Sequence, residues 1–166
     1  DQSGQSNIIS RLKTININID ENDPKIKKLL NEVKDREFIG YSYDGADASF
    51  ELLARRLMGD IPRYISINEY DVSVKKDSAG EIISHAKAKL EVDGQKILCE
   101  GQGNGPVNAL DNAIRKNVNK LAKYSEYLKD LKLVDYKVRI LNTGTEAVTR
   151  VSIESTDSNG KNWFTI

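Results

Sequence analysis

The glycine-rich segment Gly101–Gly105 is the part of this sequence most typical of a ligand site. It lies between a predicted strand and a helix that Pro106 is expected to open, where backbone N–H groups and the helix dipole favour an anion. Its G-x-G-x-G spacing differs from the dinucleotide motif and no Walker Lys-Ser/Thr follows, which disfavours a nucleotide. A tight corner that needs positive φ at glycine is the simplest interpretation. A third interpretation is a site for a small anion such as an amino-acid carboxylate, to which Asn104 would add polar contacts and Val107 an apolar one.

The other titratable side chains supply no catalytic set. His85 is expected on the polar face of a strand beside lysines, and Cys99 in a strand core. Asp44, Asp47 and Glu51 form a weak metal-binding pattern, and helix capping explains the first two. One His and one Cys do not make a zinc site of the usual types, and one Cys makes no intramolecular disulfide. The residues therefore indicate a binding or regulatory α+β domain rather than an enzyme.

The composition of the chain argues against some classes of binding partner. The chain of 166 residues has 25 Lys+Arg and 25 Asp+Glu, interspersed, with 39% hydrophobic residues. These values predict a soluble globular protein of one domain, or one domain with an appendage, that binds neither nucleic acid nor membranes. No export signal and no membrane-spanning run is present in the sequence, so we expect a cytoplasmic location.

Helical periodicity dominates residues 1–61. A helix is expected after an Asp23 cap with Pro24 at its first position, and a second helix after Asp44 or Gly45, ending near Gly59. Residues 1–19 suggest a short helix followed by an alternation that fits an edge strand or an ordered linker. Two short amphipathic helices make a poor core alone, so we interpret 1–61 as a helical linker subdomain that packs on something else.

From Arg63 the apolar period changes from helical to two. Strands are expected around 70–74, 86–92 and 96–101, with Asp93-Gly94 as a hairpin turn, before a helix at 106–122. The pattern then begins again, because Tyr70 and Tyr136 stand in similar sequences 66 residues apart. We therefore predict an α+β fold in which the helical linker precedes a duplicated βββα domain over 62–166. The repeats are about 62–128 and 129–166, and the second lacks its final helix, so one face of its sheet is bare or covered by a partner.

Three segments, Ser3–Ile8, Gly40–Leu53 and Gly103–Ala113, resemble the 2-isopropylmalate synthase/citramalate synthase family. Leu133–Arg139 extends the resemblance over nearly the whole chain, and the sequences of these segments are most similar to the citramalate synthase branch. Members condense acetyl-CoA with a 2-oxo acid in a metal-dependent (β/α)8 barrel. The resemblance implies that this chain is the end of the linker and the C-terminal regulatory domain. It implies no catalytic residue, metal or cofactor in this part, and an acyltransferase as the parent, with a divalent metal and acetyl-CoA.

The resemblance also implies an effector site between the paired regulatory domains of a homodimer. A branched-chain amino acid would bind there for feedback inhibition, isoleucine in the citramalate branch and leucine in the isopropylmalate branch. A turn at 144–147 resembles a family loop that keeps the pocket open. A stand-alone protein-interaction domain stays the alternative. Carried over position by position, the effector pocket consists of Gly103, Asn104, Gly105, Pro106, Val107, Asn108, Leu133, Tyr136, Ile140 and Ala147.

Overall fold

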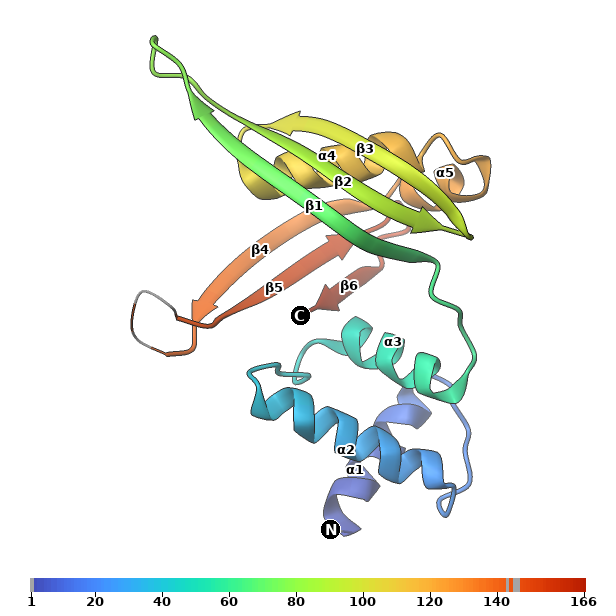
Figure 1. The fold of residues 1–166 in the computed structure, drawn as a ribbon. Coiled ribbons are helices and arrows are strands. Elements are labelled where there is room, and N and C mark those ends of the chain that lie inside the picture. Colours follow the sequence, from blue (N-terminus) through green and yellow to red (C-terminus); the bar gives the residue numbers. More distant parts are fainter. Residues whose placement is uncertain (1, 143, 145–146) are drawn as a thin grey trace. The chain divides into compact units, whose positions relative to one another are not determined.

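The fold comes from a computed structural model that describes residues 2–142, 144 and 147–166. The chain divides into two compact units (Figure 1). One consists of residues 1–62 together with 131–166, and the other of residues 63–130. The assignment of 1–61 and 62–166 to separate domains stays a prediction.

Three helices form the first part of the chain and build a core of their own. Helix α1 contributes Ile8 and Leu12, and the connection after it contributes Ile17, to a buried cluster with the helices that follow. The expectation that two helices lack an apolar surface to pack on is therefore wrong, because α1 supplies it. Residues 15–19 form no strand and act as an ordered connection. The bounds are α1 Gln2–Thr14, α2 Pro24–Phe38 and α3 Asp47–Met58.

The ends of these helices follow the sequence signals in part. Asp23 caps α2 as predicted, and its carboxylate accepts a hydrogen bond of 2.8 Å from the Lys25 N–H. Helix α3 begins after Ala46, which has no capping side chain, so the prediction of Asp44 or Gly45 at this position is wrong. Gly59 ends α3 in the left-handed conformation, with φ 81°, as a C-terminal glycine commonly does.

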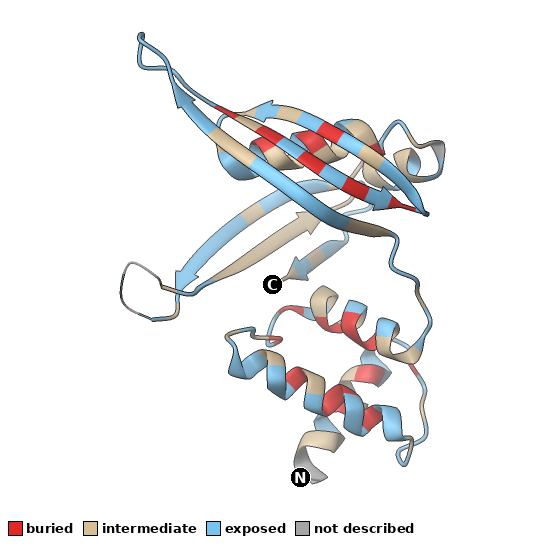
Figure 2. Ribbon diagram, viewed as in Figure 1, coloured by how far each residue is buried: buried red, intermediate tan, exposed pale blue. Residues whose placement is uncertain are grey.

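The unit of residues 63–130 is a three-stranded antiparallel sheet, in the order β1-β2-β3, with helix α4 packed on one face. Figure 2 shows buried positions alternating along β2, and Ala86, Ala88, Leu90 and Val92 are all buried there. The helix predicted over 106–122 is two helices instead, because the chain turns after α4 and forms α5. The bounds are β1 Ile65–Lys76, β2 Ile82–Val92, β3 Gln95–Gly103, α4 Pro106–Val118 and α5 Ala122–Leu128.

The Asp93-Gly94 hairpin turn forms where it was predicted. Both residues have positive φ, 50° for Asp93 and 78° for Gly94, as the tight turn between two twisted strands requires. The Asp93 carboxylate holds α5 to this turn, since it accepts hydrogen bonds from Lys123 Nζ at 2.9 Å and Tyr124 Oη at 2.8 Å.

A second antiparallel sheet, β4-β5-β6, belongs to the other unit. The first strand of each sheet has a register shift at the same place, between Ile67 and Glu69 in β1 and between Leu133 and Asp135 in β4. These shifts lie 66 residues apart, the spacing of the sequence repeat. The predicted α+β fold with a duplicated βββα domain is confirmed, and the second copy consists of three strands in this chain. The bounds are β4 Lys132–Ile140, β5 Thr149–Thr156 and β6 Asn162–Thr165.

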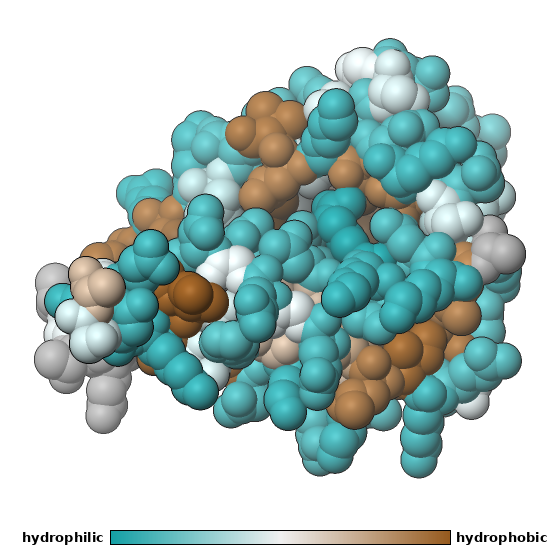
Figure 3. All heavy atoms as spheres, turned by 90° about the horizontal axis from the view of Figure 1, so that it is seen from above, coloured by the Kyte–Doolittle hydropathy of each residue, from teal (hydrophilic) through white to brown (hydrophobic). Residues whose placement is uncertain are grey.

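The two copies differ in burial. In the first copy, α4 covers the alternate residues of β2, whereas most of β4 is exposed. On the face drawn in Figure 3, apolar side chains lie in separate patches among polar ones. Among the described residues, no helix combines the length and the apolar character needed to cross a membrane.

Candidate functional site

The glycines of the β3–α4 corner allow the helix to approach the sheet. A Cβ on Gly101 would lie 2.4 Å from the backbone nitrogen of Ala113, and one on Gly103 would lie 2.6 Å from that of Ala109. Neither glycine has positive φ, and Gly105 is extended with φ −160°. The interpretation of this segment as a corner that needs positive φ is therefore wrong. The reason for glycine at 101 and 103 is close packing of helix against strand.

The first turn of α4 leaves its N-terminus open to a ligand. Gly105 caps the helix without a side-chain hydrogen bond, and Pro106 occupies the first turn. The carboxamide oxygen of Asn108 accepts a hydrogen bond from the Asn104 N–H at 3.2 Å, which folds the corner over the helix start. Asn104, Pro106, Val107 and Asn108 are exposed. This end of α4 therefore presents backbone dipoles and the apolar side chains of Pro106 and Val107 to solvent.

A buried hydroxyl lies next to this corner in the sheet. Ser84 is opposite Gly103 in the β2–β3 ladder and is fully buried. Its Oγ has no hydrogen-bond partner among the described residues. Sequence reasoning did not single out Ser84, because its place in the apolar alternation of β2 resembles that of a small core residue.

Three predicted site residues of the second repeat, Leu133, Tyr136 and Ile140, share one face of β4. Tyr136 is opposite Ile153 and Ile140 is opposite Thr149 in the β4–β5 ladder. Leu133, Tyr136 and Ile140 have exposed fractions of 50%, 40% and 66%, so this apolar face is open.

The remaining predicted pocket residues lie in the β4–β5 connection and in the other unit. Ala147 is half-buried, whereas residues 145 and 146 of the predicted turn lie outside the described residues. The group at 103–108 and the group on β4 belong to different units, so their meeting in one pocket stays a prediction.

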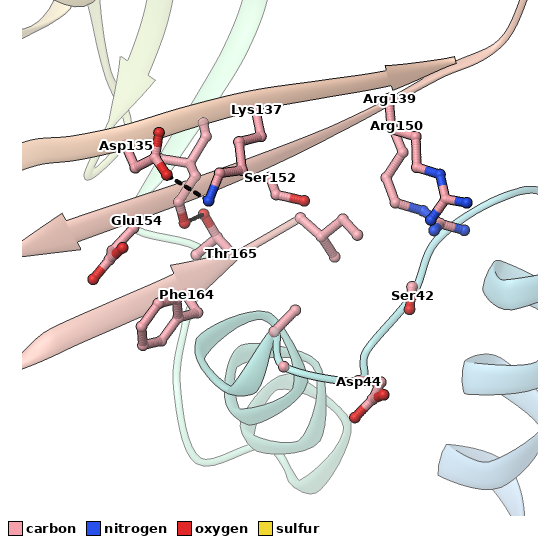
Figure 4. A pocket seen from close by; sticks show the side chains of 14 residues that line it. Ser42, Asp44, Asp135, Lys137, Arg139, Arg150, Ser152, Glu154, Phe164 and Thr165 are labelled. Atoms are coloured by element: carbon pink, nitrogen blue, oxygen red, sulfur yellow. Dashed lines mark hydrogen bonds and ion pairs between the residues drawn. The ribbon is translucent and has the colours of Figure 1, made fainter. Parts of the chain in front are cut away.

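A cavity of about 270 Å³ within the unit of residues 1–62 and 131–166 was not predicted. It lies between the polar face of β4–β5 and the loop before α3 (Figure 4). Lys137 forms an ion pair of 2.7 Å with Asp135 and holds the pKa of that carboxyl below its usual value. Arg139 and Arg150 are directly opposite each other across the two strands. Strand register brings them together, and spacing along the chain alone did not reveal it.

The candidate catalytic and metal-binding residues are apart or occupied by other contacts. Asp47 pairs with Arg11 at 3.1 Å and Glu51 with Arg55 at 2.8 Å. Cys99 is buried, as predicted, and burial raises the pKa of its thiol. Among the described residues, no three His, Cys, Asp or Glu side chains are grouped so that they could hold a metal ion.

Comparison with known families identifies this arrangement of a helix and two repeats. Residues 44–166, from the loop before α3 to the end of the second sheet, match the LeuA allosteric (dimerisation) domain. The chain belongs to this family. The LeuA dimerisation domain thus includes α3 and both βββ sheets of this chain, and both groups of predicted effector residues lie inside it.

Curated relatives of this LeuA dimerisation domain are citramalate synthases. The chain is 41% identical to the (R)-citramalate synthase of Aquifex aeolicus (strain VF5) and 40% identical to that of Geobacter sulfurreducens. The enzyme of the same name from Synechocystis sp. is 39% identical. Each match covers 100% of this chain and 31% of the relative, so the chain spans about a third of the length of these relatives.

Proposed function

We propose that this chain is the regulatory and dimerisation part of a citramalate synthase, and that it binds a branched-chain amino acid, isoleucine, for feedback inhibition. The observation that carries the proposal is that one dimerisation domain contains two open surfaces. One is the N-terminus of α4, where the N-cap residue Gly105 provides no side-chain hydrogen bond, and the other is the exposed apolar face of β4 around Tyr136. A branched-chain amino acid has a carboxylate for the helix N-terminus and an aliphatic side chain for the apolar face.

The carboxylate of the effector suits the start of α4. Anions are stabilised at helix N-termini by unpaired N–H groups and by the helix dipole. The corner at Gly103–Asn108 adds carboxamide groups, and Asn108 already accepts a hydrogen bond from the Asn104 N–H. A zwitterionic ligand also suits a chain whose formal net charge is zero.

The side chain of the effector suits the apolar residues. Val107, Leu133 and Ile140 each expose about half or more of their surface. Burying an aliphatic side chain of a few carbons contributes about 1.5–3 kcal/mol, enough to select against small or polar amino acids. The shape of an apolar pocket alone gives only a small difference in affinity between isoleucine and leucine, because their side chains differ in the position of one methyl group.

Dimerisation and feedback follow from the same surfaces. Two copies of the domain that meet on their exposed apolar faces bury them, and an effector between the copies favours that arrangement by mass action. The rest of the parent would condense acetyl-CoA with a 2-oxo acid at a divalent metal in a separate catalytic barrel. Inhibition is then a coupling free energy between effector and catalytic site, which the helices of the linker would transmit.

Calorimetric titration of the chain with isoleucine, leucine and valine tests the proposal. We expect saturable heat with isoleucine and weaker binding of the other two. A preference for leucine would assign the chain to the isopropylmalate branch and contradict the citramalate assignment. Heat from none of the three, for a folded chain, would contradict effector binding and favour a plain protein-interaction domain.

A further inference from the structure

The two arginines in the cavity of Figure 4 form a like-charged pair across two strands. Arg139 on β4 is directly opposite Arg150 on β5, so their side chains leave the same face of the sheet. Like charges directly opposite each other destabilise a sheet. The pair therefore costs the folded chain stability unless an anion neutralises it.

The surroundings leave both guanidinium groups available. Arg150 Nε donates a hydrogen bond of 2.7 Å to the carbonyl of Gly40, which fixes the side chain, and no carboxylate of the described residues pairs with its other N–H groups. Within the described ranges 2–142, 144 and 147–166, the Arg139 guanidinium has neither a hydrogen-bond nor an ion-pair partner. Ser42, from the loop before α3, lines the same end of the cavity.

The carboxylates of the cavity lie away from this end. Lys137 pairs with Asp135, and Glu154 also acts on Lys137, so that both acids raise the pKa of its ammonium group. Asp44 lines the cavity as well, and Figure 4 shows it apart from the two guanidinium groups. Among the residues that the structure describes, Lys137 pairs with Asp135 on one side of the cavity, and Arg139 and Arg150 form no ion pair at its other end.

We propose that Arg139, Arg150 and Ser42 bind a phosphate group, either free phosphate or the phosphate of a small metabolite. Guanidinium groups bind phosphate through paired N–H donors, and a phosphate monoester carries about −1.5 to −2 charge at neutral pH. One such group balances both arginines, whereas a monocarboxylate balances one. The cavity of about 270 Å³ has room for more than the phosphate group itself. The site is independent of the amino-acid site proposed above.

Thermal unfolding of the chain tests the site, with inorganic phosphate and ribose 5-phosphate titrated at constant ionic strength against chloride. We expect a saturable rise in Tm with at least one of them, and Arg139→Gln should weaken binding about tenfold or more because hydrogen bonds between charged groups are strong. Arg139 is the first choice because its guanidinium has no hydrogen-bond or ion-pair partner among the described residues, and Arg150→Lys keeps the charge while removing the fork. The matched control is Arg56→Gln, which removes an exposed positive charge from the same unit outside this cavity.

Three results separate the outcomes. Tighter binding of ribose 5-phosphate than of phosphate would identify a phosphorylated metabolite, and equal binding would identify free phosphate, each in support of the site. Arg139→Gln should also leave the ligand-free chain equally stable or more stable, because it removes the like-charge pair. The proposal is overturned by the absence of saturable stabilisation with either ligand, or by an equal effect in Arg139→Gln and the unsubstituted chain.

Discussion

Asn68 and Val134 occupy the same place in two successive sheets, 66 residues apart in the chain. Each is the residue skipped by the register shift in the first strand of its sheet, and its flanking residues pair with consecutive residues of the neighbouring strand. Such a shift adds one residue and bends the strand locally. A shared bulge at the spacing of the sequence repeat shows that the second sheet is a copy of the first.

Substitution of Gly101 tests the role of close packing at the β3–α4 corner. Gly101→Ala would place a Cβ 2.4 Å from the Ala113 nitrogen, so α4 must move. We expect the free energy of unfolding in urea to fall by at least about 1–3 kcal/mol. Gly105→Ala is the control, since a Cβ there meets nothing within 4 Å. Its effect should stay below about 1 kcal/mol, as lost helix capping and reduced chain entropy oppose each other. Equal losses in both variants would contradict the packing argument.

Removal of the Ser84 hydroxyl should not destabilise the chain. Its Oγ is buried without a partner among the described residues, and an unpaired buried polar group costs about 1–3 kcal/mol. Ser84→Ala should therefore leave the free energy of unfolding unchanged or raise it. Ala86→Ser places a second hydroxyl on the same buried face and should lower it. A loss of more than about 1 kcal/mol in Ser84→Ala would show that this hydroxyl has a stabilising partner.

Asp93 should make stability depend on acid pH. Hydrogen bonds from Lys123 and Tyr124 lower the pKa of Asp93 below its ordinary value of 3.8. Because the folded pKa is lower than the unfolded one, this stabilisation is complete above the unfolded pKa and is lost as pH falls through the folded pKa.

Urea unfolding at a series of pH values measures this contribution. Asp93→Asn should flatten the acid limb of the stability profile, and asparagine tolerates the positive φ of this turn position. Glu91→Gln, on the exposed face of β2, is the control and should keep the slope of the unsubstituted chain. An unchanged acid limb in Asp93→Asn would mean that the carboxylate does not hold α5.

Much of this fold is predictable because its signals are local. Strict alternation marks β2, and Asp93-Gly94 marks a turn that only residues tolerant of positive φ adopt. The repeat is visible as similar amino-acid sequences around Tyr70 and Tyr136. These features depend on neighbours in the chain, which the sequence displays directly.

Several of the errors concern contacts that local sequence signals do not describe. Gly101 and Gly103 are glycines because of the backbone of α4, which no local rule for turns describes. The core of the first three helices depends on Ile8 and Leu12 from α1, and the cavity depends on Arg139 facing Arg150. To predict such contacts one must know the register of the strands or the packing of the helices, and the spacing of residues along the chain gives neither.

Substitution of Tyr136 should lower effector affinity much more than it lowers the stability of the fold. Its side chain is 40% exposed, so Tyr136→Ala should change the free energy of unfolding by less than about 1 kcal/mol. Affinity for isoleucine should fall about tenfold or more, as the ligand loses an apolar contact surface. Tyr127→Ala is the matched control, with a tyrosine that is 78% exposed on α5 and outside the proposed pocket. If stability and affinity decline in parallel in Tyr136→Ala, this tyrosine is a structural residue.

We expect Gly103–Asn108 and the β4 face to bind one effector together. Titration of the isotope-labelled chain with isoleucine, followed by amide NMR shifts, measures this most directly. Amides of Gly103–Gly105, Val107 and Asn108 should shift in the same titration as those of Leu133, Tyr136 and Ile140, with one midpoint equal to the calorimetric dissociation constant. Saturable shifts confined to one of the two groups, or elsewhere in the chain, would contradict a shared effector site.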